Sequence, residues 1–122
     1  MGSAGSVSKA TTTVRVYRLE DANGEGPYNS NLLDPDYRLQ MSGSHSFDST
    51  HPTSSAEGFG FPYVHEYFAF LSMTDLFRWF GGYLKPLMER GVSIGVYEVD
   101  SSEVRIGTRQ VLFNKTLSIK VK

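Results

Sequence analysis

One stretch of the chain, residues 67–99, constrains the fold more than any other. It reads as an aromatic strand end, an amphipathic helix, a second helix, a glycine stop and another strand. Ser72 is a good helix N-cap, and Asp75 three residues later is typical of a capped first turn. The apolar residues that follow at helical spacing are Met73, Leu76, Phe77 and Phe80. This succession predicts an α+β core.

Glycine and proline punctuate the second half of the chain. Gly81 and Gly82 end the first helix, and residues 83–90 form the second, with Pro86 in its first turn and Gly91 just after its end. Gly107-Thr108 is typical of a two-residue hairpin loop. The strands that we predict here are residues 92–99, 103–106, 109–113 and 116–121.

The first half begins with a strand and continues into a long loop. Residues 11–20 alternate and are rich in β-branched side chains, which predicts a strand, and Asn23-Gly24 is a strong turn signal. Residues 29–60 carry Ser, Gly, Pro, Asp, His and Asn without a clear period. We predict that this loop lacks extended regular structure, with at most a short turn of helix at residues 32–33 and 37–41. We also predict that Tyr28, Tyr37 and Phe47 dock it onto the sheet.

Together these elements predict a flexible leader at residues 1–12 and one α+β domain at 13–122. The expected architecture is a mixed, largely antiparallel sheet of five or six strands, with two short helices on one face and a long irregular loop. The expected core residues are Phe70, Leu76, Phe77, Phe80, Leu84, Leu87, Val96 and Val111.

Composition excludes several classes of protein. The 122 residues contain no cysteine, so disulfides, thiol nucleophiles and thiolate metal sites are excluded. No apolar run approaches the roughly 20 residues that span a bilayer. The N-terminus has no apolar segment of the kind found in signal peptides. We therefore expect a soluble, cytoplasmic protein that makes no membrane contact.

Charge is unevenly distributed, although the formal net charge is only −1. Residues 20–36 contain five acids and no Lys or Arg, which is either a solvated face or a surface for a basic partner. The C-terminal strands are only modestly basic, so direct nucleic-acid binding is not expected. The candidate partner-binding residues are Glu25, Asp34, Asp36, Tyr28 and Tyr37.

Motifs for catalysis or metal binding are absent from the sequence pattern. His45, His51 and His65 match no metal-ligand spacing, so no metal site is predicted. There is no G-x-S-x-G nucleophile elbow. Spacing singles out none of the carboxylates suited to acid–base work, which are Glu20, Asp21, Glu66, Glu98 and Glu103.

Several segments nevertheless resemble small, mostly uncharacterised phage and prophage proteins. The resemblance runs from about residue 14 to 113. It lies in Val16-Tyr-Arg-Leu-Glu20 with Gly24-Glu-Gly-Pro-Tyr28, in His51-Pro-Thr53, in Phe68-Ala-Phe70 with Leu76-Phe-Arg-Trp-Phe80, in Gly91–Val99, and in Arg109-Gln-Val-Leu-Phe113. Such proteins look like a miniature ADP-ribosyltransferase architecture, in which a first-strand Arg or His and a late-strand Glu grip NAD.

Carried over, this resemblance implies an NAD site formed by Tyr17, Arg18, His51 and Gln110. Gln110 stands where the family pattern has an acid. A glutamine can hydrogen-bond a ribose hydroxyl but cannot act as a base, so Glu98 or Glu103 would have to substitute.

Three functions follow from these observations. The first is a non-enzymatic phage module, without cofactor, that masks a host protein or complex in the bacterial cytoplasm; inhibition of a defence complex, as by an anti-CRISPR protein, is its sharpest form. The second is an NAD-dependent ADP-ribosyltransferase. The third is a phage accessory or structural protein. Oligomeric state and target stay open.

Overall fold

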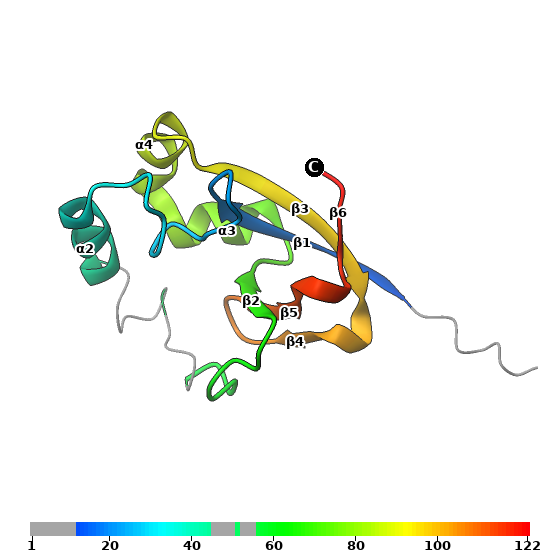
Figure 1. The fold of residues 1–122 in the computed structure, drawn as a ribbon. Coiled ribbons are helices and arrows are strands. Elements are labelled where there is room, and N and C mark those ends of the chain that lie inside the picture. Colours follow the sequence, from blue (N-terminus) through cyan, green and yellow to red (C-terminus); the bar gives the residue numbers. More distant parts are fainter. Residues whose placement is uncertain (1–11, 45–50, 52–55) are drawn as a thin grey trace, which may run out of the picture.

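The structure, a computed structural model, describes residues 12–44, 51 and 56–122, and its strands form two sheets (Figure 1). The first sheet has the order β1-β3-β6 and the second β2-β5-β4, and every pairing is antiparallel. The first sheet consists of β1 (Thr13–Glu20), β3 (Ser93–Asp100) and β6 (Ile119–Lys120). The second consists of β2 (Glu66–Ala69), β4 (Val104–Ile106) and β5 (Val111–Asn114).

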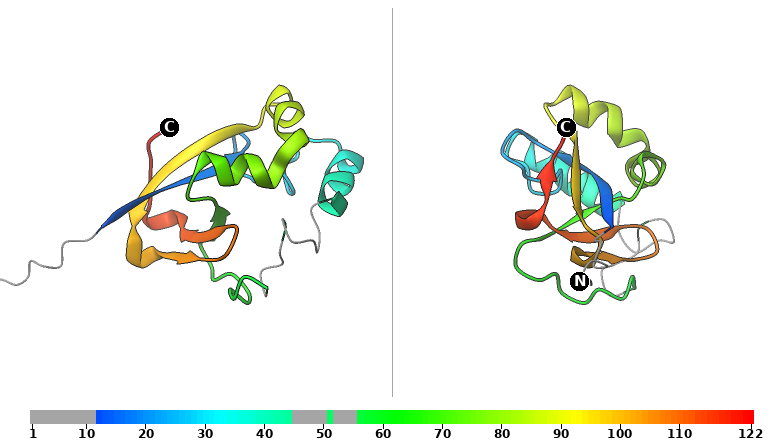
Figure 2. Two further views of the ribbon diagram at one scale, coloured as in Figure 1. Left: turned by 180° about the vertical axis from the view of Figure 1, so that it is seen from behind. Right: turned by 90° about the vertical axis from the view of Figure 1, so that its right-hand side faces the viewer.

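The predicted α+β class is confirmed, but the prediction of one mixed sheet with five or six strands is wrong. The two sheets meet at a single bridge, where the backbones of Tyr17 and Phe70 exchange two hydrogen bonds of 2.8 Å. The pairing stops there because the chain reaches the helix cap at Ser72 two residues later. In both views of Figure 2, β1 and β3 run through the middle of the molecule, with α4 and the β4–β5 hairpin on opposite sides.

The two predicted helices are present. Helix α3 (Met73–Phe80) begins where the Ser72 hydroxyl accepts a 3.1 Å hydrogen bond from the Asp75 N–H. A 3₁₀ turn, η2 (Gly81–Tyr83), leads into α4 (Leu84–Glu89), whose first turn contains Pro86. Gly91 then adopts a φ of 98°, the left-handed conformation that commonly follows a helix end.

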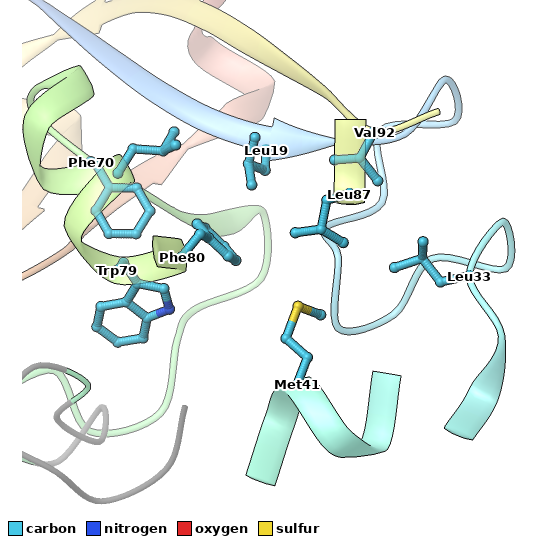
Figure 3. Packing of buried hydrophobic residues seen from close by; sticks show 9 residues of the cluster. Leu19, Leu33, Met41, Phe70, Trp79, Phe80, Leu87 and Val92 are labelled. Atoms are coloured by element: carbon cyan, nitrogen blue, oxygen red, sulfur yellow. The ribbon is translucent and has the colours of Figure 1, made fainter. Parts of the chain in front are cut away.

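An additional helix, α2 (Pro35–Ser44), corrects the prediction that residues 29–60 lack extended regular structure. Its start combines two familiar signals. Asp34 accepts a hydrogen bond from the Tyr37 N–H at 3.3 Å, and Pro35 occupies the first helical position. Met41 is fully buried, and in Figure 3 it extends from α2 toward the side chains around Leu87. One buried side chain therefore anchors this short helix to the core.

Two clusters of buried side chains form the core. The larger joins α2, α3 and α4 to one end of β1; its aromatic centre is Phe70, Trp79 and Phe80 (Figure 3). The smaller lies between the two sheets around Val16, Tyr97 and Phe113. Six of the eight predicted core residues are buried and Leu84 is half-buried; the six are Phe70, Leu76, Phe80, Leu87, Val96 and Val111.

The eighth predicted core residue, Phe77, is 47% exposed, so this prediction is wrong. Helix α3 turns Leu76, Trp79 and Phe80 toward the core instead. Trp79 is favoured at the buried position because its N–H finds an acceptor there, the Tyr28 hydroxyl at 2.7 Å. Tyr28 and Tyr37 pack against the larger cluster, whereas Phe47 lies outside the described residues.

The turn between β4 and β5 is centred one residue later than predicted. Ile106 faces Val111, and the Gly107 N–H donates to the Gln110 carbonyl at 2.9 Å, so Thr108 and Arg109 form the turn. The reason is a distant contact. Glu57 accepts hydrogen bonds from the backbone N–H groups of Arg109 and Gln110, which fixes the turn at this position.

Candidate functional site

A cavity of about 250 Å³ opens where β1, β2, α3 and the turn before β5 meet. Aromatic rings form much of its wall: Tyr28, Tyr67, Phe68, Phe70, Trp79 and Phe80. Polar side chains join them: Arg18, Glu25, Asn29, Glu66 and Gln110. An apolar cavity with a few convergent polar groups is the usual form of a ligand site.

Arg18 lies in the cavity wall with its guanidinium fixed in three directions. It donates hydrogen bonds to the Phe68 carbonyl at 3.0 Å, to the Gly24 carbonyl at 3.1 Å and to Glu20 at 3.1 Å. Its side chain is only 8% exposed and lies over the Tyr67 ring at 4.9 Å. Arg18 is therefore held rigidly, and cannot swing out to solvent without losing these partners.

Glu20 supports Arg18 from behind the cavity wall. This buried carboxylate accepts hydrogen bonds from the Tyr97 hydroxyl at 2.6 and 2.8 Å and from Lys120 at 2.8 Å, and Lys115 lies 3.6 Å away. Burial raises the pKa of Glu20, but the bonds from Lys120 and Tyr97 and the two lysine charges outweigh it and lower the pKa below its ordinary value. Glu20 is ionised at neutral pH and anchors the cationic groups around it.

Gln110 lines the cavity from the turn before β5, and it is 8% exposed. Its side-chain Nε2 donates to Glu57 Oε2 at 2.8 Å, and its backbone N–H donates to Glu57 Oε1 at 2.9 Å. Glu57 is itself 8% exposed. A buried carboxylate therefore sits directly behind Gln110.

Glu66, at the start of β2, also reaches the cavity wall, and it is bound by Arg105. The guanidinium makes two hydrogen bonds to the carboxylate, at 2.6 and 2.9 Å, and the Tyr63 N–H adds a third at 2.7 Å. The bond from Arg105 lowers the pKa of Glu66 and outweighs burial, which acts in the opposite direction. Glu66 is thus an ionised carboxylate whose oxygens are occupied by protein donors.

The structure brings Arg18 and Gln110 to one cavity, but it does not bring the other two predicted residues with them. Tyr17 is half-buried and packs against the larger core cluster, because neighbouring strand residues point to opposite faces. The His51 ring contacts Trp79 edge-on at 4.7 Å, and its Nε2 lies at hydrogen-bond distance from the Trp79 carbonyl. His51 therefore touches a cavity residue without lining the cavity.

The candidate partner-binding residues divide into two groups. Glu25, Asp34 and Asp36 are exposed, and Glu25 lies at the cavity. Tyr28 and Tyr37 are half-buried in the larger cluster, where Tyr37 meets Tyr83 edge-on at 5.9 Å. Burial raises the pKa of Tyr28 to about 12, so its hydroxyl stays neutral. The three carboxylates are available to a partner, and the two tyrosines mainly organise the core.

Among the described residues, no group of three or more His, Asp or Glu side chains is placed to hold a metal ion. His65 is exposed, with a φ of 75°, and His45 lies outside the described residues. The three remaining carboxylates named in the sequence analysis, Asp21, Glu98 and Glu103, do not line the cavity.

Sequence reasoning missed Glu57 and Trp79 as site residues. Glu57 falls in a stretch without period or motif, and only its three-dimensional approach to the turn reveals its role. Trp79 carried a usable signal, since it follows Leu76 at helical spacing and so shares its face of α3.

None of the helices in the described part of the chain has the length and apolar character that a membrane crossing requires.

The comparisons with known proteins give one result. No curated protein and no solved structure matches the chain. Residues 14–122 match the family model described as Bacteriophage T4 Y00F protein, and because this match spans most of the sequence, the chain belongs to that phage protein family.

Proposed function

We propose that the protein is a phage nucleotide-binding domain of the ADP-ribosyltransferase type, and that its cavity takes the nicotinamide end of NAD. One observation carries this proposal. Arg18 on the first strand and Gln110 beside a late strand are the two positions that the family resemblance implies. They line the same cavity although Arg18 lies in β1 and Gln110 lies in the turn before β5.

The chemistry of the cavity suits such a ligand. The Arg18 guanidinium can donate to a ribose hydroxyl or a phosphate, and the aromatic walls can pack against a planar ring. The cavity volume of about 250 Å³ lies below the roughly 300–1,000 Å³ of typical ligand sites. It therefore fits one end of a dinucleotide, and the other end would extend past Glu25 into solvent.

The same residues limit what the site does with NAD. Gln110 cannot remove a proton. Of the two carboxylates that line the cavity, Glu66 is engaged by Arg105, and Glu25 is exposed to solvent. When bound, NAD supplies an activated glycosidic bond. The residues of this chain bind and orient it, and slow transfer or simple retention of NAD is the expected outcome.

Titration of the purified protein with NAD, followed by calorimetry, tests the proposal. We expect saturable binding that weakens about tenfold or more in Arg18→Lys, which keeps the charge but loses the fork of donors. Arg78→Lys, at an exposed position on α3, is the matched control and should bind normally. Nicotinamide release and a mass shift on a host protein would report transfer. Absence of saturable binding at millimolar NAD would defeat the proposal.

A second candidate function is favoured by the acidic surface. Of the five acids in residues 20–36, Glu20 and Asp21 are buried, which leaves Glu25, Asp34 and Asp36 exposed. No Lys or Arg lies in this segment to neutralise them. Such a surface suits a module that binds a basic face of a host defence protein and masks it, without any cofactor.

A further inference from the structure

Glu57 is a buried acidic residue whose side chain accepts hydrogen bonds from the turn that carries Gln110. Its Oε1 accepts the backbone N–H groups of Arg109 at 2.6 Å and Gln110 at 2.9 Å, and its Oε2 accepts the Gln110 side-chain Nε2 at 2.8 Å. Together the two oxygens accept three N–H groups from two adjacent residues.

The chain is shaped to admit this carboxylate. A Cβ atom on Gly107 would lie 2.5 Å from Glu57 Oε1 and 2.7 Å from Phe59 Cζ, so Glu57 and Phe59 would have to shift to admit it. Glycine at this position thus lets the carboxylate approach the turn closely. The contact therefore depends on two residues: Glu57 supplies the carboxylate, and Gly107 leaves the space that it occupies.

The contact fixes which end of the Gln110 carboxamide faces the cavity. The Gln110 NH₂ group donates to Glu57 Oε2, so the oxygen of the carboxamide lies at the end that does not contact Glu57. The Gln110 backbone carbonyl accepts from the Gly107 N–H. The side-chain oxygen Oε1 is the polar atom left over, and no described residue donates to it. Gln110 is one of the residues that line the cavity, so this oxygen is the polar side-chain atom that it has left for a ligand.

We propose that Glu57 is a positioning residue that holds the Gln110 carboxamide with its oxygen toward the cavity, so that the site selects a ligand with a hydrogen-bond donor there, such as a sugar hydroxyl. This inference rests on the proposed function for its choice of ligand. It assigns opposite polarities to the two ends of the site, since Arg18 donates and Gln110 accepts.

Glu57→Gln is the most informative variant. The new amide can still accept the two backbone N–H groups through its oxygen, while its NH₂ group faces Gln110. Gln110 must then reverse, which turns a donor toward the cavity. The double variant Glu57→Gln with Gln110→Glu exchanges donor and acceptor, so the bond re-forms and an oxygen again faces the ligand. Glu89→Gln, at an exposed position on α4, is the control.

NAD is the probe for ligand binding. We expect affinity to fall about tenfold or more in Glu57→Gln, because a donor now meets the donor of the ligand, and to return to within about threefold of native in the double variant. Unchanged affinity in Glu57→Gln would overturn the inference. Thermal unfolding of each variant verifies that the turn is intact.

A second measurement separates this inference from the proposed function. The signal of the Gln110 side-chain NH₂ group in a ¹H–¹⁵N spectrum can be identified because it disappears in Gln110→Ala. In the native protein without ligand, this NH₂ group should be protected from solvent exchange. It should lose that protection in Glu57→Ala. Averaged, rapidly exchanging NH₂ signals in the native protein would refute the role of Glu57. Failure of the native protein to bind NAD would defeat the proposed function instead.

Discussion

Arg18 and Gln110 line one cavity, Arg18 from β1 and Gln110 from the turn that precedes β5. Within the described residues, the backbones of the two sheets pair at one bridge, between Tyr17 and Phe70. Phe70 of this bridge and Arg18, the neighbour of Tyr17, both line the cavity. The cavity thus lies where regular pairing ends, and the carboxylates Glu20 and Glu57 hold its two polar walls in place.

Tyr28→Phe should destabilise the protein. The Trp79 N–H donates to the Tyr28 hydroxyl at 2.7 Å, and Trp79 is only 7% exposed. Removal of the acceptor leaves a buried donor without a partner, which costs about 1–3 kcal/mol. Urea unfolding should show this loss, while Tyr63→Phe, at a position 68% exposed, should leave the midpoint nearly unchanged. Equal midpoints for the two variants would contradict the prediction.

Stability should fall as the solution becomes acidic, and Glu20 should account for part of the fall. Its pKa in the folded protein is lower than the ordinary value of about 4.3, so the unfolded chain binds the proton first. The stabilisation is complete above about pH 5 and disappears as the pH falls through the folded pKa. Urea midpoints between pH 7 and pH 3 should therefore decline less steeply in Glu20→Gln than in the native protein.

The urea midpoint of Glu20→Gln should still decline somewhat as the pH falls, because two other carboxyls also have a lowered pKa. The Ser30 hydroxyl lowers the pKa of Asp21, and Arg105 lowers that of Glu66. Glu89→Gln, on the exposed face of α4, should retain the full native slope. If Glu20→Gln showed the same slope as this control, the network around Glu20 would contribute nothing to acid sensitivity.

Two glycine-to-alanine changes should have opposite effects. Gly107→Ala places a methyl group against Glu57 and Phe59 and should cost about 1–3 kcal/mol of stability, with weaker NAD binding as Glu57 is displaced. Gly43→Ala, on α2, meets nothing within 4 Å and should stabilise by about 0.5–1 kcal/mol through its helix propensity. Thermal unfolding of both variants measures the difference; a stabilising Gly107→Ala would show that the turn can move.

Local signals predicted most elements of this fold. The Ser72 cap, the glycines after α3 and α4 and the alternation of β1 each act over a few residues, and each appears as expected. The same kind of signal was present for α2, in Asp34 and Pro35, but the polar composition around it concealed the helix. Local signals could not predict that the strands divide into two sheets. That division arises because an isolated bridge at Tyr17 and Phe70, rather than a continuous ladder, connects β1 to the end of β2.

The candidate site was predictable only where a strand position determined it. Arg18 follows from the alternation of β1 together with the family resemblance, and Gln110 from its place beside β5. Glu57 was not predictable, since it acts on backbone N–H groups, which any residue at the turn would present. Its sole sequence correlate is Gly107, and a glycine in a hairpin has an ordinary explanation in turn geometry alone.

Charge reversal at Glu25, Asp34 and Asp36 distinguishes the two candidate functions. If the protein masks a basic host surface, the triple change to lysine should weaken capture of a bacterial partner, and the native interaction should itself weaken as salt rises. Exposed charges are screened over roughly 8–10 Å at physiological ionic strength, so both effects are expected of this surface. Pull-down from a host lysate at two salt concentrations provides the measurement.

The cavity variants complete this comparison. For a masking module, Arg18→Lys and Gln110→Ala should leave partner capture intact, because Arg18 and Gln110 are buried. For an NAD-dependent protein, the same variants should abolish the effect on the host protein, and the lysine substitutions should matter little. Capture that survives the triple reversal at low and at high salt would remove the acidic surface from consideration and leave the cavity as the functional site.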